Sequence, residues 1–167
     1  VRALPRTRRQ AVTEIVWRPS PERIAATQMA AFMAQQGFES YSDLWQWSIA
    51  DRAGFWDAVW VDGGVIASAQ PTASIGTERM PGTEWFPGAR LNFAENLLRR
   101  DDSGIAVIAV DEGSNRQDLT WSELRAAVAR AQTGLRRLGV GVGDRVAGLL
   151  PNGIESLVAM LATTATG

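Results

Sequence analysis

The sequence predicts an α/β protein, in which a helical, Trp-rich N-terminal region precedes the first β-α-β-α elements of a larger domain with an incomplete sheet. Six of the seven Trp lie in residues 14–100, where short helical stretches alternate with Gly- and Pro-rich segments. Residues 101–167 alternate apolar strands with amphipathic helices, an order typical of right-handed crossovers in a parallel sheet. We expect three parts: a flexible Arg-rich arm (1–13), the N-terminal region (14–100) and the start of the α/β domain (101–167).

The helices of the N-terminal region are predicted from their end signals. Ser20 can cap a first helix with Pro21 at its first position, and Gly37 follows its last turn. Ser42 can start a short helix, and Ser48 begins a capping-box pattern for the next one. The apolar faces of these three helices carry Ala25, Met29, Phe32, Met33, Leu44, Trp45, Trp47, Phe55, Trp56, Val59 and Trp60.

Gly63-Gly64 ends the third helix, and residues 65–91 are expected to be extended or looped because Pro and Gly recur throughout. Asn92 then caps a further helix, with Glu95 at its third position. The charged residues 99–102 are the predicted boundary with the α/β part.

The second part has clearer periodicity. Residues 105–110 form a continuous apolar run typical of a strand buried on both faces, and a turn leads to a short strand at 119–121. A long amphipathic helix follows, with Ser122 as its cap and Gly139 as its stop. Another strand is predicted at 144–150.

Pro151 to Gly153 form a turn before a final helix that buries Ile154 and Leu161. Two long strands and one short one, with helices between them, cannot cover both faces of a sheet. We therefore expect this chain to be the leading segment of a longer α/β protein.

The composition excludes several kinds of chemistry. The chain has no Cys and no His, and all 17 of its basic residues are Arg. A thiolate nucleophile, a Ser-His-Asp triad, a zinc site of the usual N/S kind, a lysine Schiff base and a Lys-containing phosphate loop are therefore absent from it. The net charge of −1 argues against nucleic acid as a partner.

The arm at 1–13 carries four Arg and no acid, which suits either an anionic partner or a solvated terminus. No apolar run approaches 18 residues, and the first 25 residues lack an apolar signal core. We therefore expect no membrane span and no secretory signal. The absence of Cys fits a reducing compartment, and the predicted location is cytoplasmic.

Several residue groups are candidates for chemistry, each with a structural alternative. Gly139, Gly141 and Gly143 fail the phosphate-loop spacing and follow a helix, so they are interpreted as a helix stop and turn. Asn152 follows a predicted strand, where ligands of α/β sheets bind, but it also suits a helix cap. Arg90 suits an anion clamp or bonds to carbonyls of its own loop.

Two further groups are interpreted mainly as structural. The carboxylate pairs at 101–102 and 111–112 flank a predicted strand, so solvated loop charge is preferred over acid–base chemistry. Four Trp residues could form a stacking platform for bases or sugars. Their helical spacing favours instead a packed aromatic core or a docking face for another domain. These four are Trp45, Trp47, Trp56 and Trp60.

The densest feature is the run from Trp85 to Asn96, a rigid loop-to-helix elbow, and here the sequence resembles a known family. Residues 80–98 resemble the N-terminal region of acetoacetyl-CoA synthetases (acetoacetate–CoA ligases), which are acyl-adenylate-forming enzymes of the AMP-binding superfamily. Residues 41–48 and 55–60 are similar to the helical lead-in shared with acetyl-CoA synthetases. Five short stretches resemble the opening of the adenylate-forming large domain, namely residues 119–124, 138–140, 143–146, 151–152 and 159–162.

The resemblance spans residues 17–167, and it favours the acetoacetate branch because acetate-activating relatives usually carry Cys and His after the corresponding Trp-Phe. It implies that acetoacetate, Mg-ATP and CoA give acetoacetyl-CoA, AMP and pyrophosphate through an acyl adenylate. The phosphate loop, acyl pocket and catalytic Lys of such enzymes lie further downstream. No catalytic, cofactor-binding or metal residue is therefore assigned to residues 1–167, which are expected to be inactive alone.

The partners implied by the resemblance are these small substrates and the chain's own downstream domain. Two alternatives remain open at the level of sequence: the N-terminal fragment of an acetyl- or propionyl-CoA synthetase-like ligase, and a non-enzymatic interaction module with an Arg-rich arm and an aromatic docking face.

Overall fold

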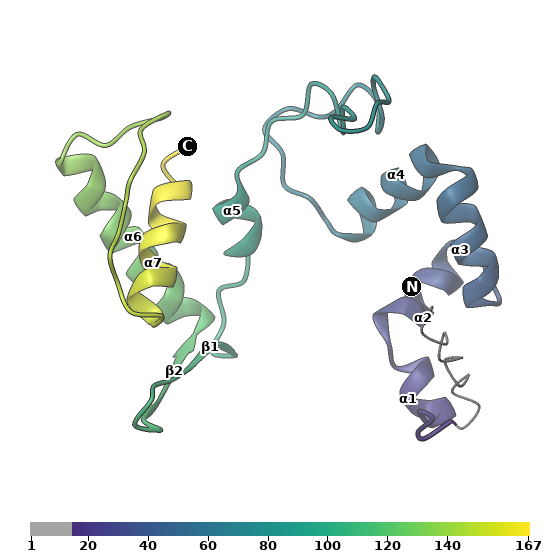
Figure 1. Ribbon diagram of the computed structural model, residues 1–167, viewed down its shortest axis with the longest axis horizontal. Coiled ribbons are helices and arrows are strands. Elements are labelled where there is room, and N and C mark those ends of the chain that lie inside the picture. Colours follow the sequence, from purple (N-terminus) through teal and green to yellow (C-terminus); the bar gives the residue numbers. More distant parts are fainter. Residues whose placement is uncertain (1–14) are drawn as a thin grey trace, which may run out of the picture. The chain divides into compact units, whose positions relative to one another are not determined.

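The structure, a computed structural model, describes residues 15–167, and the arm predicted at residues 1–13 lies outside the described residues. The described part has two compact units that divide between Ala58 and Val59, inside one helix. The helices and strands follow one another as shown in Figure 1. They are α1 (Pro21–Ala25), α2 (Gln28–Gln35), α3 (Tyr41–Ala50), α4 (Arg52–Asp62), α5 (Phe93–Leu97), β1 (Ile105–Val110), β2 (Arg116–Thr120), α6 (Trp121–Arg137) and α7 (Ile154–Thr164).

The first unit begins with a helix that the structure divides in two. Ser20 caps α1 as predicted, and Pro21 is its first residue. The helix does not continue to residue 36, because Thr27 is extended and accepts a hydrogen bond from the Ala30 N–H at 3.1 Å, which starts α2 anew. Gly37, at φ 77°, then ends α2 as predicted.

The caps of the next two helices differ from the prediction. Ser40, not Ser42, caps α3 by accepting from the Asp43 N–H at 3.1 Å. Ser48 does not cap a new helix, because its hydroxyl lies within α3 and donates to the Trp45 carbonyl. Asp51 starts α4 instead, since its carboxylate accepts from the Gly54 N–H at 2.9 Å.

An aromatic cluster joins these short helices. Phe55 of α4 packs edge-on against Phe32 and Trp47, with ring centroids 6.3 and 5.6 Å apart. Phe38 lies against Trp47 at 5.2 Å. Such offset and edge-to-face contacts are the favourable aromatic geometries, so a few rings serve as the core of this small unit.

The second unit is built on α6, which has the longest run of helix in the described residues. Its cap is Thr120 rather than the predicted Ser122, and Glu123 completes a reciprocal capping box. At the other end Gly139, at φ 89°, allows the Val140 N–H to reach the Leu135 carbonyl at 3.1 Å. This Schellman motif confirms the predicted helix stop.

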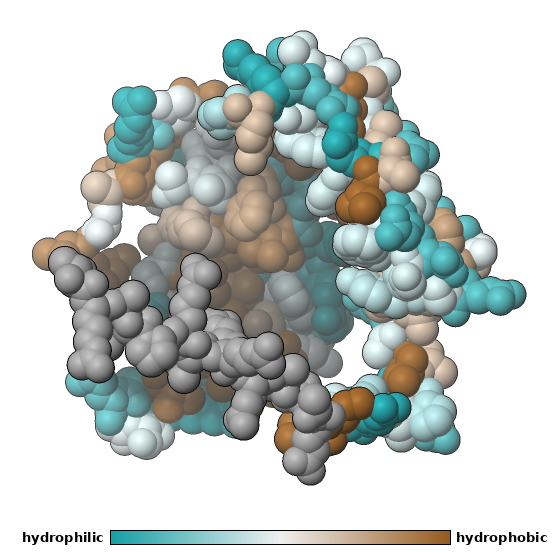
Figure 2. Space-filling view, turned by 45° about the vertical axis from the view of Figure 1, so that its right-hand side comes forward, coloured by the Kyte–Doolittle hydropathy of each residue, from teal (hydrophilic) through white to brown (hydrophobic). Residues whose placement is uncertain are grey.

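The core of the second unit lies where α6 and α7 pack together. Its fully buried residues are Ala94, Leu124, Val128, Leu161 and Ala162. Ala106, Val107 and Leu119 of the two strands pack against the same cluster, while Ile105, Ile108 and Val110 are more than half exposed. Figure 2 shows hydrophobic residues, in brown, among hydrophilic ones on the face that it views.

The predicted fold class, a helical region followed by a small, incomplete α/β part, is confirmed. The prediction of a parallel sheet is wrong, because the strand pair is antiparallel. β1 and β2 pair antiparallel, from Ile105 opposite Thr120 to Val110 opposite Arg116. The turn between them is too short for the crossover that a parallel pair requires. Residues 144–150, predicted to be a strand, are exposed and join no strand ladder among the described residues.

One consequence for acid stability follows from the capping box. The backbone N–H and hydroxyl of Thr120 donate to the Glu123 carboxylate and lower its pKa below the usual value of about 4.5. The unfolded chain then binds more protons than the folded one in this range, so the stabilisation is present above about pH 4.5 and is lost as the pH falls through the folded pKa.

We expect Glu123→Gln, which keeps the hydrogen-bonding shape but cannot titrate, to flatten the loss of stability between about pH 3 and 5. Urea unfolding of residues 1–167 at a series of pH values measures this. Equal slopes for the parent and Glu123→Gln would contradict the assignment.

Candidate functional site

The loop at residues 65–91, before α5, contains strand-like pairing that the sequence does not predict. Its two arms pair antiparallel through isolated bridges, Ala69 with Arg90 and Ile75 with Trp85. The Phe86 N–H donates to the Ser74 carbonyl at 2.9 Å and Ser74 is buried. Sequence patterns missed this pairing because each arm contains Pro and Gly, which are rare inside regular strands.

The elbow at Phe86 is attached to the end of α4. Phe86 has φ 48°, a left-handed conformation that costs a non-Gly residue on the order of 1–3 kcal/mol. Its ring packs on Trp60 with the centroids 4.6 Å apart, and the Ala89 N–H closes the Pro87-Gly88 turn onto the Phe86 carbonyl at 3.1 Å. Packing against Trp60 and closure of the turn together hold the strained residue.

Two Asn side chains connect α5 to segments distant in the sequence. Asn92 caps α5 as predicted, accepting from the Glu95 N–H at 3.1 Å, and its amide also donates to the Thr164 carbonyl at the end of α7 at 2.7 Å. Asn96 holds Ile66 from both sides, accepting from its N–H at 2.8 Å and donating to its carbonyl at 2.9 Å. Only the cap was visible in the sequence.

Three further side chains donate to carbonyls at helix ends. Arg99 donates to the Gly63 carbonyl after α4 at 2.6 Å, Arg125 to the Leu98 carbonyl after α5 at 2.7 Å, and Gln132 to the Ala165 carbonyl after α7 at 2.6 Å. A helix C-terminus leaves carbonyls without intrahelical donors and favours a cation. These contacts therefore satisfy polar groups and fix α5 relative to α6 and α7.

A groove of about 580 Å³ lies between these helices. Its apolar floor includes Ala94, Val128 and Ala165, and Arg99, Arg125 and Gln132 stand around it. Arg99, Arg125 and Gln132 already donate to backbone carbonyls, so these three side chains serve the fold, and the exposed Glu95 also lines the groove. This arrangement is suited to packing between α5, α6 and α7.

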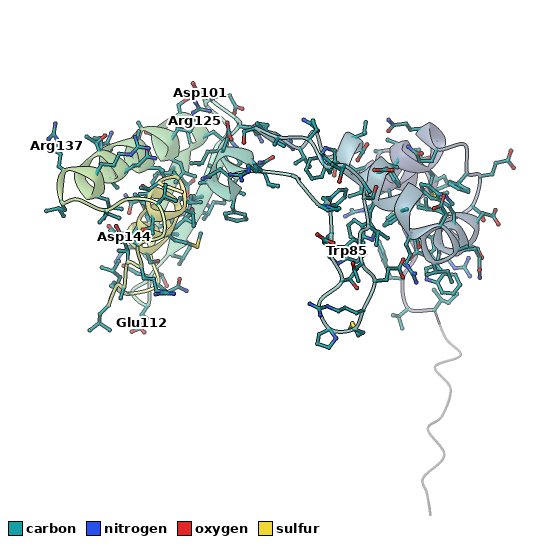
Figure 3. All side chains as sticks on the ribbon, turned by 90° about the horizontal axis from the view of Figure 1, so that it is seen from above. Trp85, Asp101, Glu112, Arg125, Arg137 and Asp144 are labelled. Atoms are coloured by element: carbon teal, nitrogen blue, oxygen red, sulfur yellow. The ribbon has the colours of Figure 1, made fainter. Side chains whose placement is uncertain are left out.

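The predicted carboxylate pairs are held by local partners. Arg100 donates two hydrogen bonds of 2.9 Å to Asp102 and lowers the pKa of that carboxyl, with help from the Gly104 N–H. Asp101 forms an ion pair with Arg125, in which 3.9 Å separates the Asp101 Oδ1 from the Arg125 Nε. Both residues are labelled in Figure 3. Asn115 bonds to Asp111 across the hairpin turn and lowers its pKa.

Asp101, Asp102 and Asp111 therefore serve loop structure, and Glu112 is exposed in the hairpin turn. Within residues 15–167, no group of three or more His, Cys, Asp or Glu is close enough to hold a metal ion.

The four candidate Trp do not form one platform. Trp47 belongs to the aromatic cluster, Trp56 contacts Phe55 at 5.4 Å, and Trp60 packs on Phe86 in the second unit. Trp45 is the member that remains about half exposed without a ring contact. Trp47 and Trp60 are thus packed against rings distant in the sequence, as the packed-core interpretation expects, whereas Trp56 is 37% exposed.

Two candidates, Asn152 and Arg90, differ from the structural alternative that the sequence offers for each. Asn152 is not the cap of α7: Gly153 occupies that position and no side chain bonds there. Asn152 lies instead beside a cavity of about 280 Å³ between the β1–β2 hairpin and the start of α7. The Arg90 side chain is exposed and makes no hydrogen bond or ion pair with the described residues, so it does not bond to its own loop carbonyls.

Comparison with known proteins defines the class first. Residues 41–97 match the family described as acetyl-coenzyme A synthetase N-terminus, and residues 95–167 match the family described as AMP-binding enzyme. These two matches meet at α5, the helix held by Asn92 and Asn96. The chain is therefore similar to both families, and the two matched segments overlap at residues 95–97.

Within that class the chain is a homologue of acetoacetyl-CoA synthetases and corresponds to their N-terminal part, which confirms the resemblance inferred from the sequence. It is 42% identical over 158 residues to the acetoacetyl-coenzyme A synthetase of Rhizobium meliloti, covering 91% of this chain and 24% of that protein. A malonamoyl-CoA synthetase of Penicillium aethiopicum is 42% identical over 168 residues, covering 92% and 23%.

A solved structure of an acetoacetyl-CoA synthetase from Streptomyces lividans matches with a TM-score of 0.82 at 40% identity, covering 90% of this chain and 25% of that one. The chain thus spans about a quarter of the length of the relatives it matches. None of the helices described between residues 15 and 167 is both long and apolar enough to cross a membrane.

Proposed function

We propose that this chain is the N-terminal part of an ATP-dependent acetoacetate–CoA ligase. The observation that carries the proposal is the 42% identity to an acetoacetyl-coenzyme A synthetase across 91% of the chain. The complete enzyme would join the acetoacetate carboxylate to the α-phosphate of ATP, release pyrophosphate, and then transfer the acyl group to the CoA thiol with release of AMP. Mg²⁺ would neutralise charge on the triphosphate in the first step.

The 167 residues supply a scaffold in this proposal. Their polar contacts in the second unit connect α4, α5 and α7 through backbone carbonyls, and the carboxylates flanking β1 are engaged in loops. We assign the reacting groups to the three quarters of the relatives' length that this chain does not cover. The free edge of the β1–β2 hairpin and residues 144–150 would then join a larger sheet.

The proposed division of the chain keeps the arm at 1–13, the N-terminal region at 14–100 and the α/β part at 101–167. It is supported by the two family matches, which meet at residues 95–97. The proposed cytoplasmic location is supported by the absence of Cys from the chain. Its proposed partners are acetoacetate, ATP and CoA.

A second candidate substrate is malonamate, because one relative is named a malonamoyl-CoA synthetase at the same 42% identity. Acetoacetate and malonamate both carry a carbonyl at C3, followed by a methyl in one and an amino group in the other. The two acids are nearly isosteric, so a pocket shaped for one admits the other unless a polar group distinguishes them.

The test uses the full-length polypeptide with ATP, Mg²⁺, CoA and, in separate assays, acetoacetate, malonamate, acetate and propionate. AMP and acyl-CoA are measured by chromatography, and acetoacetate is expected to give the highest kcat/KM. Higher kcat/KM with acetate or propionate would assign the enzyme to the neighbouring branch. Residues 1–167 alone should give no AMP, and turnover by them would overturn the scaffold role.

A further inference from the structure

The four Asn side chains of the chain differ in how firmly they are held. Asn92, Asn96 and Asn115 each donate a hydrogen bond from the side-chain amide, at 2.7, 2.9 and 2.9 Å respectively. Asn152 is exposed, and its amide makes no hydrogen bond with the described residues. The Asn152 carboxamide is therefore free to turn toward the backbone that follows it.

The residue after Asn152 is Gly153, and no other Asn of this chain precedes a Gly. The other three precede Phe93, Leu97 and Arg116. A side chain on the following residue crowds the approach of that residue's backbone nitrogen to the Asn carboxamide, whereas Gly has no Cβ and adopts more backbone conformations. Asn152 thus combines a free carboxamide with an unhindered neighbouring nitrogen.

The backbone nitrogen of Gly153 can move without unwinding α7. Gly153 is the N-cap of α7, with an extended backbone at φ −142° and ψ −169°. Its N–H donates to the Pro151 carbonyl at 2.9 Å and so closes a turn of three residues outside the helix. The Gly153 carbonyl, by contrast, accepts from the Leu157 N–H in the first turn of α7. The short turn can therefore open while the helix stays formed.

We propose that Asn152 is a modification site, at which the chain deamidates spontaneously through a succinimide. The backbone nitrogen of Gly153 attacks Cγ of Asn152, and the Cγ–Nδ2 bond breaks. Nδ2 leaves as ammonia and takes up the proton that the Gly153 nitrogen loses. Water then opens the five-membered ring at either of its carbonyls, which leaves aspartate or isoaspartate at position 152. This reaction consumes water alone and does not depend on the proposed ligase activity.

Either product changes the surroundings of the N-terminus of α7. The neutral amide becomes a carboxylate beside the cavity that Asp111 and Glu155 also line. Isoaspartate in addition lengthens the main chain by one carbon, two residues before the buried Ile154. Each event adds a negative charge, so modified chains can be separated from the parent by ion exchange.

The first test follows the full-length polypeptide during incubation at neutral and mildly alkaline pH. Mass spectrometry of short, mildly acidic digests measures deamidation at each Asn, and a sample that has not been incubated corrects for deamidation during preparation. Enzymatic methylation of isoaspartate identifies that product. We expect Asn152 to react at least tenfold faster than Asn115, which is also exposed but has a bonded amide. Reaction at Asn152 no faster than at Asn115 would overturn the proposal.

The second test changes the attacking residue. Gly153→Ala places a Cβ 3.2 Å from Glu155 Oε2, the end of a flexible side chain that can move aside. We expect this variant to deamidate at Asn152 at least tenfold more slowly than the parent. Gly141→Ala, the same change in an exposed turn, is the matched control and should leave the rate at Asn152 unchanged. Equal rates in the parent and Gly153→Ala would exclude attack by the Gly153 nitrogen.

The pH dependence of the parent protein gives a readout that needs no variant. Because the Gly153 nitrogen must lose its proton, the rate at Asn152 should rise steeply with pH, about tenfold for each pH unit above neutrality. A rate that does not change with pH would contradict the succinimide route. Acyl-CoA formation is measured separately, so failure of this proposal and failure of the proposed function give different results.

Discussion

Leu161→Ala is expected to lower the free energy of unfolding of residues 1–167 by about 2–5 kcal/mol, the range for truncating a fully buried Leu. Leu161 has no exposed surface and lies in the cluster that joins α7 to Leu124 and Val128 of α6. Removing its side-chain carbons forfeits their burial and leaves a cavity that the surrounding helices cannot fill. Urea unfolding followed by circular dichroism measures the loss as a shift in midpoint.

Leu149→Ala is the matched control for this experiment. Leu149 is fully exposed in the segment before α7, so the same chemical change should alter stability by less than about 0.5 kcal/mol. Complete loss of the cooperative transition in Leu161→Ala would be the upper end of the expected effect. Similar midpoints for the two variants would contradict the description of the core.

Asn92→Ala is expected to lower the free energy of unfolding by about 2–4 kcal/mol, because the Asn92 side chain both caps α5 and donates to the Thr164 carbonyl. Loss of the N-cap on α5 contributes about 1 kcal/mol. Loss of the donor to the Thr164 carbonyl leaves a part-buried acceptor without its partner, which adds about 1–3 kcal/mol. The measurement is again the urea midpoint of residues 1–167.

Asn92→Ser separates the two contributions. A Ser can still accept from the Glu95 N–H, but it carries no amide to donate to Thr164. We therefore expect its loss of stability to be about half that of Asn92→Ala. If Asn92→Ser were as stable as the parent chain, the contact between α5 and α7 would contribute nothing, contrary to the structure.

Helix ends were predictable where a single residue type decides them. Ser20, Asn92, Gly37 and Gly139 act as predicted, because a short polar side chain or a left-handed Gly satisfies the orphan groups of its own helix. The wrong predictions arose where two capping residues lie within a few positions. Ser40 and Thr120 cap in place of Ser42 and Ser122, since the extended backbone that a cap requires falls at the earlier residue.

The candidate site was less predictable than the helices. The hydrogen bond from Asn92 to Thr164 spans 72 positions in the sequence, and that from Arg99 to Gly63 spans 36. No local pattern marks such a pair, because any Asn or Arg on a helix surface has the same donors. Only the packing of α5 on its neighbours determines which carbonyl each one reaches.

By itself, the sequence determined which stretches are helical, which Gly residues stop them, that 105–110 is a strand, and which family the chain resembles. These properties depend on periodicity and on residues a few positions apart. The tertiary structure alone decided that β1 and β2 pair antiparallel, that residues 144–150 lack a partner, and that Trp45 stays exposed while Trp47 is packed. Strand pairing and burial are stabilised by contacts between segments that are far apart in the sequence. They therefore depend on which surfaces meet after the local elements have formed.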